Sequence, residues 1–214
     1  MDDRVTEVYR LLAGLPRCGF ETPKDALPSD GIYFFFERGE EVAIEDQSVD
    51  RVVRVGTHRE DARFPARISQ HYGNRHSLGG HKNGSVFRKH LGGALLRRQN
   101  PADPRITPWI TQGGESYPGV EEAVSRELRA NFTFAWVTVP TRDARLSLES
   151  GLIALLAQFA AGSPSADWLG GFAVDPAIRV CGLWNTQHLN SAALTRPELA
   201  RLEDFAAASK AGKR

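Results

Sequence analysis

The sequence predicts an α+β fold in which a small, mainly antiparallel sheet of three strands, or slightly more, is flanked by helices. Two runs rich in aromatic and β-branched residues, 31–37 and 51–56, predict neighbouring strands joined as an antiparallel hairpin. A third run, 132–139, alternates large aromatic residues with smaller ones and ends at Pro140. Segments of helical periodicity precede, separate and follow these runs, so helices should flank the sheet.

The composition is that of a soluble globular protein. Of the 214 residues, 41% are hydrophobic and 25% are charged, which suffices for a sizeable core without disulfide bonds. The longest apolar stretch, 151–161, is interrupted by Gln158 and is too short to cross a bilayer, so we expect no membrane contact. The N-terminus lacks the apolar segment of a secretory signal, which predicts a cytoplasmic protein. Cys18 and Cys181 are isolated and predict buried free thiols.

The chain divides into three parts. Residues 1–30 predict an N-terminal accessory helix and linker, because apolar residues recur at helical spacing over the first fifteen positions. Residues 31–162 form the predicted central domain with an enlarged insertion. Residues 163–214 predict a C-terminal extension packed on the same domain. Within it, aromatic turns precede a helix that opens at Thr195 with a capping box closed by Glu198 and ends in a basic tail.

The first strand, 31–37, lacks polar alternation and should be buried on both faces. We interpret the charged stretch 38–50 as a loop. After the second strand, residues 60–72 have a helical pattern that places Arg67 and His71 four positions apart on one face, from which both side chains can reach a common target. The following segment, 73–84, is rich in Gly, Asn, Ser and His and predicts a long loop.

Three further helices are predicted before the C-terminal extension. Apolar residues from Phe87 to Leu95 mark one helix, which ends at Asn100, and Val120, Val124 and Leu128 mark the next. The third and most apolar helix covers 145–161. Glu149 lies beside its apolar stripe, so its carboxylate should be partly desolvated and should need an arginine, a proton or a metal ion as partner.

The charge distribution along the chain is uneven. Residues 51–105 carry a net charge of +9 and five of the six histidines, whereas residues 1–50 carry −7. Clustered cations favour a polyanion such as DNA or RNA, because binding releases counterions from the phosphates. The alternative is a basic surface neutralised by the acidic segment that contains Glu40, Glu41, Glu45 and Asp46.

Four motifs resemble those of the GIY-YIG nuclease family. Gly31-Ile32-Tyr33 reproduces its first signature, and Arg54-Val55-Gly56 reproduces part of the second, with arginine where the family usually has tyrosine. Arg67 and His71 match the family's helix that carries an arginine and a histidine or tyrosine four residues later. Glu149 resembles its metal-binding glutamate. The resemblance covers roughly residues 31–159, and residues 84–92 with the later aromatic turns resemble bacterial stand-alone or restriction-endonuclease-like members.

The resemblance implies a divalent-metal-dependent endonuclease that hydrolyses phosphodiester bonds in DNA with a single Mg²⁺ or Mn²⁺ held by Glu149. It implies that Tyr33 is the general base, which requires the phenol to ionise about 3 pH units below its ordinary pKa, at a cost of roughly 4 kcal/mol. Arg67, Arg54 and the cation would favour the phenolate, and Arg67 would also contact the phosphate. His71 would hydrogen-bond either Tyr33 or the attacking water. Arg54 either clamps the phosphate or marks a loss of activity.

The expected macromolecular partner is duplex DNA. The candidate contacts are the loop residues and the cations that open the next helix: Arg75, His76, His81, Lys82, Asn83, Arg88, Lys89 and His90. Histidine spacing without paired cysteines fits no usual zinc site. A degenerate domain that binds nucleic acid without cleaving it, and a protein-interaction domain, are the alternatives. A homodimer is left open, and Asn185 and His188 are interpreted as turn residues.

Overall fold

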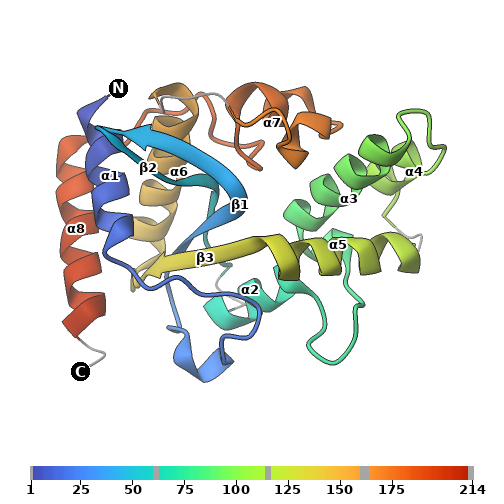
Figure 1. The fold of residues 1–214 in the computed structure, drawn as a ribbon. Coiled ribbons are helices and arrows are strands. Elements are labelled where there is room, and N and C mark those ends of the chain that lie inside the picture. The colour runs from blue at the N-terminus through green and yellow to red at the C-terminus, as the bar shows by residue number, and fades with distance from the viewer. Residues whose placement is uncertain (1, 60–62, 114–116, 160–163, 212–214) are drawn as a thin grey trace.

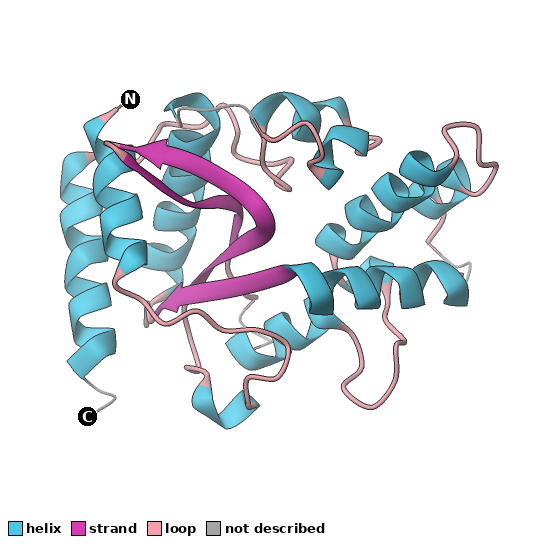
Figure 2. Ribbon diagram, in the orientation of Figure 1, coloured by secondary structure: helices cyan, strands magenta, loops and turns pink. Residues whose placement is uncertain are grey.

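A computed structural model describes residues 2–59, 63–113, 117–159 and 164–211 of the chain. A three-stranded antiparallel sheet in the order β2-β1-β3 is flanked by helices, as predicted (Figures 1 and 2). The strands are β1 (Ile32–Ile44), β2 (Gln47–Gly56) and β3 (Phe132–Val137).

The helices surround the sheet on both faces. They are α1 (Asp3–Ala13), α2 (Phe64–Tyr72), α3 (Val86–Gln99), α4 (Ile106–Thr111), α5 (Pro118–Asn131), α6 (Arg142–Phe159), α7 (Pro176–Cys181) and α8 (Arg196–Ala211), with 3₁₀ turns η1 (Lys24–Ala26), η2 (Lys82–Gly84) and η3 (Leu169–Phe172). Figure 1 shows α1, α6 and α8 together at one end of the molecule and α3, α4 and α5 at the other. None of the described helices has both the length and the hydropathy that a bilayer-spanning segment requires. The short helices α4 and α7 are not predicted from the sequence.

The central strand separates two hydrophobic cores. Ile32, Phe34 and Phe36 pack with α1, α6 and α8 on one face of the sheet. Tyr33 and Phe35 pack with α2, α3 and α5 on the other. Successive strand residues point to opposite faces, so a run with no polar alternation fills both cores and confirms the prediction of a strand buried on both sides.

The hairpin is longer than the sequence predicts. Residues 38–50, interpreted as a loop, continue β1 and begin β2, with Glu41 opposite Asp50 and the turn at Glu45, whose φ is 54°. The interpretation was wrong because this part of the hairpin has one solvent-facing side. Glu41 points outward while Val42 and Ile44 are buried, so its charges belong to an amphipathic strand.

Side chains cap the N-termini of α1 and α8, and the cap of α8 is the predicted one. Asp2 caps α1 by accepting a hydrogen bond from the Arg4 amide. The capping box at α8 is present, since the Thr195 amide donates to the Glu198 carboxylate at 2.9 Å. Both cysteines are free, as predicted, but they are half-buried instead of buried. Parts of three predicted segments, namely 60–62, 160–161 and 212–214, lie outside the described residues.

Candidate active site

Tyr33 lies on the inner face of β1 against the last residue of β2. It is fully buried and stands opposite Gly56 in the antiparallel register. A Cβ atom built at Gly56 would lie 2.2 Å from the phenolic oxygen of Tyr33. Glycine is therefore required at this position, because the phenol occupies the space of a side chain.

His71 holds the phenolic oxygen of Tyr33. Its Nε2 lies 2.9 Å from that oxygen, and its Nδ1 lies 2.8 Å from the hydroxyl oxygen of Ser85. The ring is fully buried, and burial lowers its pKa well below the usual value, helped by the charges of Arg67, Arg54 and Arg88. His71 is therefore neutral at pH 7. Of the two partners left open by the sequence, the structure brings His71 to Tyr33.

Arg67 precedes His71 by one helical turn but lies at the surface. Its Nη1 donates to Gln70 Oε1 at 3.0 Å and to the Gly84 carbonyl at 2.9 Å. The two side chains predicted to share one face of α2 thus differ in burial, because His71 is buried and Arg67 is partly exposed. The charge of Arg67 still acts on buried groups, because it adds to the lowering of the His71 pKa by burial and opposes the rise of the Glu149 pKa.

Arg54, which stands where the family usually has tyrosine, is buried under the C-terminal extension. It is 7% exposed, donates from Nη1 to the Trp184 carbonyl and lies 5.1 Å from the centre of the Phe87 ring. Among the described residues, its buried Nε has no hydrogen-bond partner. A buried guanidinium with an unused donor fits an anion such as a phosphate.

Glu149 reaches the sheet from α6. Its Oε1 accepts a hydrogen bond from the Thr57 amide at 3.0 Å. Burial raises the pKa of the carboxyl, and this effect is opposed by Arg54, the Thr57 amide, His188 and Arg67. The partial desolvation expected from the sequence is confirmed. Since Thr57 directly follows Gly56, the last residue of β2, the carboxylate and the phenol of Tyr33 are anchored to adjacent residues at the end of this strand.

The donor set fits a hard divalent cation with few protein ligands. No hydrogen bond within the described chain uses the second carboxylate oxygen of Glu149. In the described ranges, no group of three or more histidine, cysteine, aspartate or glutamate side chains is arranged to hold a metal ion. One free carboxylate oxygen suits Mg²⁺ or Mn²⁺, which take their remaining ligands from water and phosphate.

Asn185 is a structural residue of this region that sequence reasoning missed. Its Nδ2 donates to the Val55 carbonyl at 2.9 Å, and its Oδ1 accepts from the Val55 amide at 3.1 Å. The Trp184 amide donates to the Val53 carbonyl. These contacts fix the backbone of β2 on either side of Arg54. The only sequence signal was a polar amide next to the apolar pair 183–184.

His188 also lies near the candidate metal ligand. It adopts a left-handed conformation with φ 64°, and its Nδ1 lies 3.2 Å from the hydroxyl oxygen of Ser150, the residue that follows Glu149. The residue is therefore part of the surroundings of Glu149 as well as of a turn.

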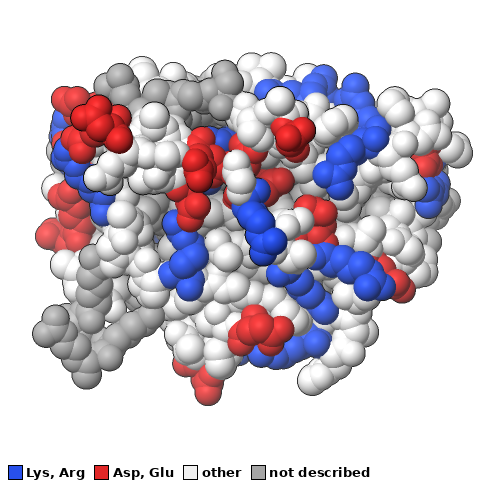
Figure 3. Space-filling model, viewed as in Figure 1, with Lys and Arg blue, Asp and Glu red and all other residues white. Residues whose placement is uncertain are grey.

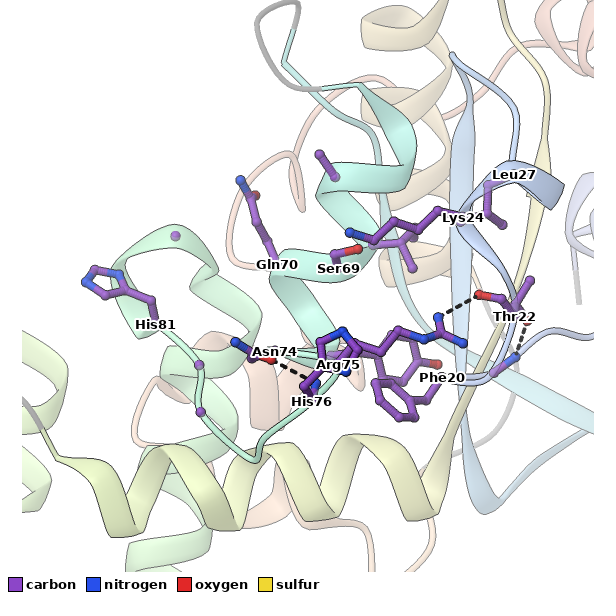
Figure 4. Close-up of a pocket in the computed structure, with 18 residues that line it drawn as sticks. Phe20, Thr22, Lys24, Leu27, Ser69, Gln70, Asn74, Arg75, His76 and His81 are labelled. Atoms are coloured by element: carbon purple, nitrogen blue, oxygen red, sulfur yellow. Dashed lines mark hydrogen bonds between the residues drawn. The ribbon is translucent and has the colours of Figure 1, made fainter.

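Part of the predicted DNA-contact loop lines a large pocket beside α2. Arg75, His76 and His81 line a cavity of about 910 Å³, together with Phe20 and Lys24 from the N-terminal linker. Figure 4 shows Arg75 crossing this pocket to the Thr22 carbonyl, with Lys24 along one wall. Four cationic or titratable side chains thus surround one hollow beside α2.

Asn83 and Lys89 lie elsewhere on the surface. Asn83 is exposed and donates to the Gly113 carbonyl. Lys89 is half-buried on α3. Both remain predicted contacts.

Three predicted contacts are overturned, because the structure buries them. Lys82 is 3% exposed and donates from Nζ to the Pro108, Trp109 and Gln112 carbonyls. Arg88 has no exposed surface and forms an ion pair of 2.6 Å with Glu121. His90 is 8% exposed, and burial, aided by the charge of Arg54, lowers its pKa to about 4. None of the three is placed to meet a phosphate backbone.

These burials also reduce the basic surface inferred from the charge distribution. Arg51 pairs with Glu40 at 2.6 Å, and Arg88 pairs with Glu121, so acidic residues outside 51–105 neutralise cations inside it. Figure 3 shows blue side chains around α3 and α5 with red ones between them. The visible face is mixed in sign.

Comparison with known families gives one match. The GIY-YIG domain family matches residues 5–211, which includes both ends of the chain that the motif resemblance left out. No curated protein and no solved structure matches the chain. The matched span contains both signature segments, the α2 residues and Glu149. The chain therefore belongs to the GIY-YIG nuclease family.

Proposed function

We propose that the protein is a divalent-metal-dependent endonuclease that hydrolyses phosphodiester bonds in duplex DNA in the cytoplasm. The observation that supports it is the gathering of candidate groups at the end of β2. Tyr33 packs on Gly56, Glu149 binds the next amide, and Arg54 lies two residues earlier. A phenol, a carboxylate and a guanidinium are thereby held by one stretch of four residues.

Nucleases of this family generally use divalent metal ions. Glu149 would hold one Mg²⁺ or Mn²⁺ through its free carboxylate oxygen. When bound, the ion supplies charge stabilisation for the phosphate and for the leaving oxygen.

The remaining chemistry falls to side chains of this chain. Tyr33, as phenolate, accepts the proton of the attacking water, while His71 contacts the phenolic oxygen of Tyr33. Arg54, from the interior, and Arg67, from the protein surface, balance the negative charge of the phosphate oxygens. Arg75, His76, His81, Asn83 and Lys89 would contact the DNA backbone on the outer surface.

A second candidate is a domain that binds nucleic acid without cleaving it. Two observations favour it, since Tyr33 has no exposed surface and arginine replaces the second signature tyrosine. A general base needs contact with water, so the two candidates differ in whether the phenol becomes accessible when DNA is bound.

The test uses the full chain, supercoiled plasmid and Mg²⁺ or Mn²⁺, with chelator as the blank. We expect nicked or linear product, and we expect Tyr33→Phe, Arg67→Ala and Glu149→Ala each to abolish it while circular dichroism and thermal unfolding stay native-like. Arg126→Ala and Glu122→Gln, on the exposed face of α5, are the matched controls and should cleave normally. DNA retention that falls steeply with salt but is never followed by cleavage supports the second candidate. No retention at low salt contradicts both.

A further inference from the structure

Ser85 connects the start of α3 to the candidate catalytic pair. It is fully buried and is the N-cap residue of α3. Its hydroxyl oxygen accepts a hydrogen bond from the Arg88 amide at 3.2 Å and lies 2.8 Å from His71 Nδ1. One hydroxyl therefore contacts both the helix terminus and the ring that holds Tyr33.

The position of the hydroxyl hydrogen follows from counting partners. The Arg88 amide is a donor, so it cannot accept that hydrogen. Within the part of the chain that the structure describes, His71 Nδ1 is the one acceptor in contact with the Ser85 hydroxyl. A buried hydroxyl hydrogen left without an acceptor costs about 1–3 kcal/mol. The hydroxyl thus donates to Nδ1.

The charge state of His71 then determines which ring nitrogen carries a proton. The ring is buried, and the charged groups around it are the guanidiniums of Arg67, Arg54 and Arg88, all of which disfavour the imidazolium. A neutral histidine carries one ring proton. With Nδ1 acting as acceptor, that proton is on Nε2, which faces the phenolic oxygen of Tyr33.

We propose that Ser85 is a positioning residue that holds His71 in the Nε2–H tautomer, so that the ring donates a hydrogen bond to Tyr33. This inference rests on the proposed role of Tyr33 as general base. A donor aimed at the phenolic oxygen stabilises the phenolate, which is the form that accepts a proton from water. The opposite tautomer would accept the phenol's own hydrogen and keep Tyr33 protonated.

The tautomer can be measured without any activity. Nitrogen-15 NMR of histidine-labelled full-length protein distinguishes the protonated from the unprotonated ring nitrogen of His71. We expect the wild type to show Nε2 protonated and Nδ1 unprotonated. In Ser85→Ala we expect a substantial population of the Nδ1–H form. A wild type with Nδ1 protonated, or a Ser85→Ala variant with an unchanged tautomer, overturns the proposal.

Two further variants separate this role from helix capping. Ser85→Thr keeps both the hydroxyl and the cap and should restore the wild-type tautomer. Ser125→Ala is a matched control, because Ser125 is also fully buried and accepts from Arg88 at 3.0 Å but makes no described contact with His71. It should lose stability without changing the tautomer. If Ser85→Ala fails to fold, the wild-type and Ser85→Thr spectra still show whether His71 is protonated on Nε2, as the proposal requires.

The kinetic readout separates this proposal from the proposed function. In the plasmid assay we expect Ser85→Ala to lower kcat about tenfold or more, with KM within about twofold, and to shift the rising limb of the kcat profile to higher pH. Ser85→Thr and Ser125→Ala should keep the wild-type profile. A wild type that never cleaves DNA contradicts the proposed function, and the NMR result then decides the role of Ser85 by itself. A cleaving wild type with an unaffected Ser85→Ala variant contradicts the proposal alone.

Discussion

Tyr33 and Gly56 face each other across the β1–β2 pair, and the phenol ring fills the space above the glycine. The contact joins the two signature segments directly. It means that the backbone of β2 sets the depth of the phenol, while His71 sets its direction.

Gly56→Ala should therefore displace Tyr33. The added carbon would lie 2.2 Å from the phenolic oxygen and 2.4 Å from Cζ, so the ring must leave the position in which it contacts His71. We expect cleavage to fall by about 100-fold or more and stability to fall by about 1–3 kcal/mol. Plasmid cleavage and urea denaturation measure the two effects. Gly119→Ala, where an added Cβ meets nothing within 4 Å, is the control. Wild-type cleavage by Gly56→Ala would contradict the arrangement.

Arg88→Met should destabilise the fold strongly. Arg88 pairs with Glu121 and also donates to the His71 carbonyl at 3.0 Å, so its loss leaves a buried carboxylate without its partner. Breaking one side of a buried pair costs about 3–5 kcal/mol. Urea denaturation should show this loss, and Arg126→Ala, at an exposed pair, should change stability by less than about 1 kcal/mol. An Arg88→Met protein as stable as the wild type would refute the structural role.

Lys89→Ala, at the neighbouring position, should weaken DNA binding and leave the stability of the fold unchanged. The side chain is half-buried on α3 and forms no ion pair within the described chain. We expect unfolding free energy within about 0.5 kcal/mol of wild type. We expect weaker DNA binding and a salt dependence reduced by about one phosphate contact. Fluorescence anisotropy over a salt series measures both. An unaltered salt slope would remove Lys89 from the interface.

Glu37 should make stability depend on pH. Its Oε2 accepts hydrogen bonds from the indoles of Trp168 at 3.0 Å and Trp184 at 3.1 Å. Burial raises the pKa of this carboxyl from 4.5 to about 7, against the opposing effect of the two indoles. The folded state then binds more protons than the unfolded state between these values, so this contribution to stability falls as pH rises from about 4.5 to about 7. It amounts to about 3 kcal/mol.

The measurement is the difference in unfolding free energy between wild type and Glu37→Gln from pH 4.5 to 8. His90, whose pKa is lowered to about 4, contributes with the opposite sign below pH 6.5, and the difference removes it. We expect the variant to gain stability over wild type as pH rises. Glu122→Gln, at an exposed position, should give a flat difference. A flat difference for Glu37→Gln would exclude a raised pKa.

Local patterns predicted the elements that carry the candidate groups. The two-sided burial of β1, the hairpin with β2, the helix that carries Arg67 and His71, and the desolvated Glu149 each follow from residues within a few positions of one another. The common target predicted for Arg67 and His71 is not observed, because Arg67 bonds Gln70 and Gly84 at the surface while His71 bonds Tyr33 in the interior. Periodicity and neighbouring apolar residues suffice for such inferences.

The failures among the candidate site residues concern partners that are distant along the chain. From the sequence, Arg88 is interpreted as a surface cation. In the structure it is buried and neutralised by Glu121, which lies 33 residues later. Lys82 is buried by carbonyls 26 to 30 residues away. The amide of Asn185 meets Val55 across 130 residues. Sequence blocks report how much charge is present, but burial depends on which chain segments fold against each other.

The pairing of the 184–185 segment with β2 has a consequence for how the protein behaves in concentrated solution. Because β2 borders the sheet, its outward amides and carbonyls would offer a template on which a second molecule could add a strand. The Val53 carbonyl accepts from the Trp184 amide, and the amide and carbonyl of Val55 both bond the Asn185 side chain. The Val52 amide donates to the Tyr9 hydroxyl. The segment that fixes the end of β2 thus also occupies the edge groups that intermolecular β-aggregation would require.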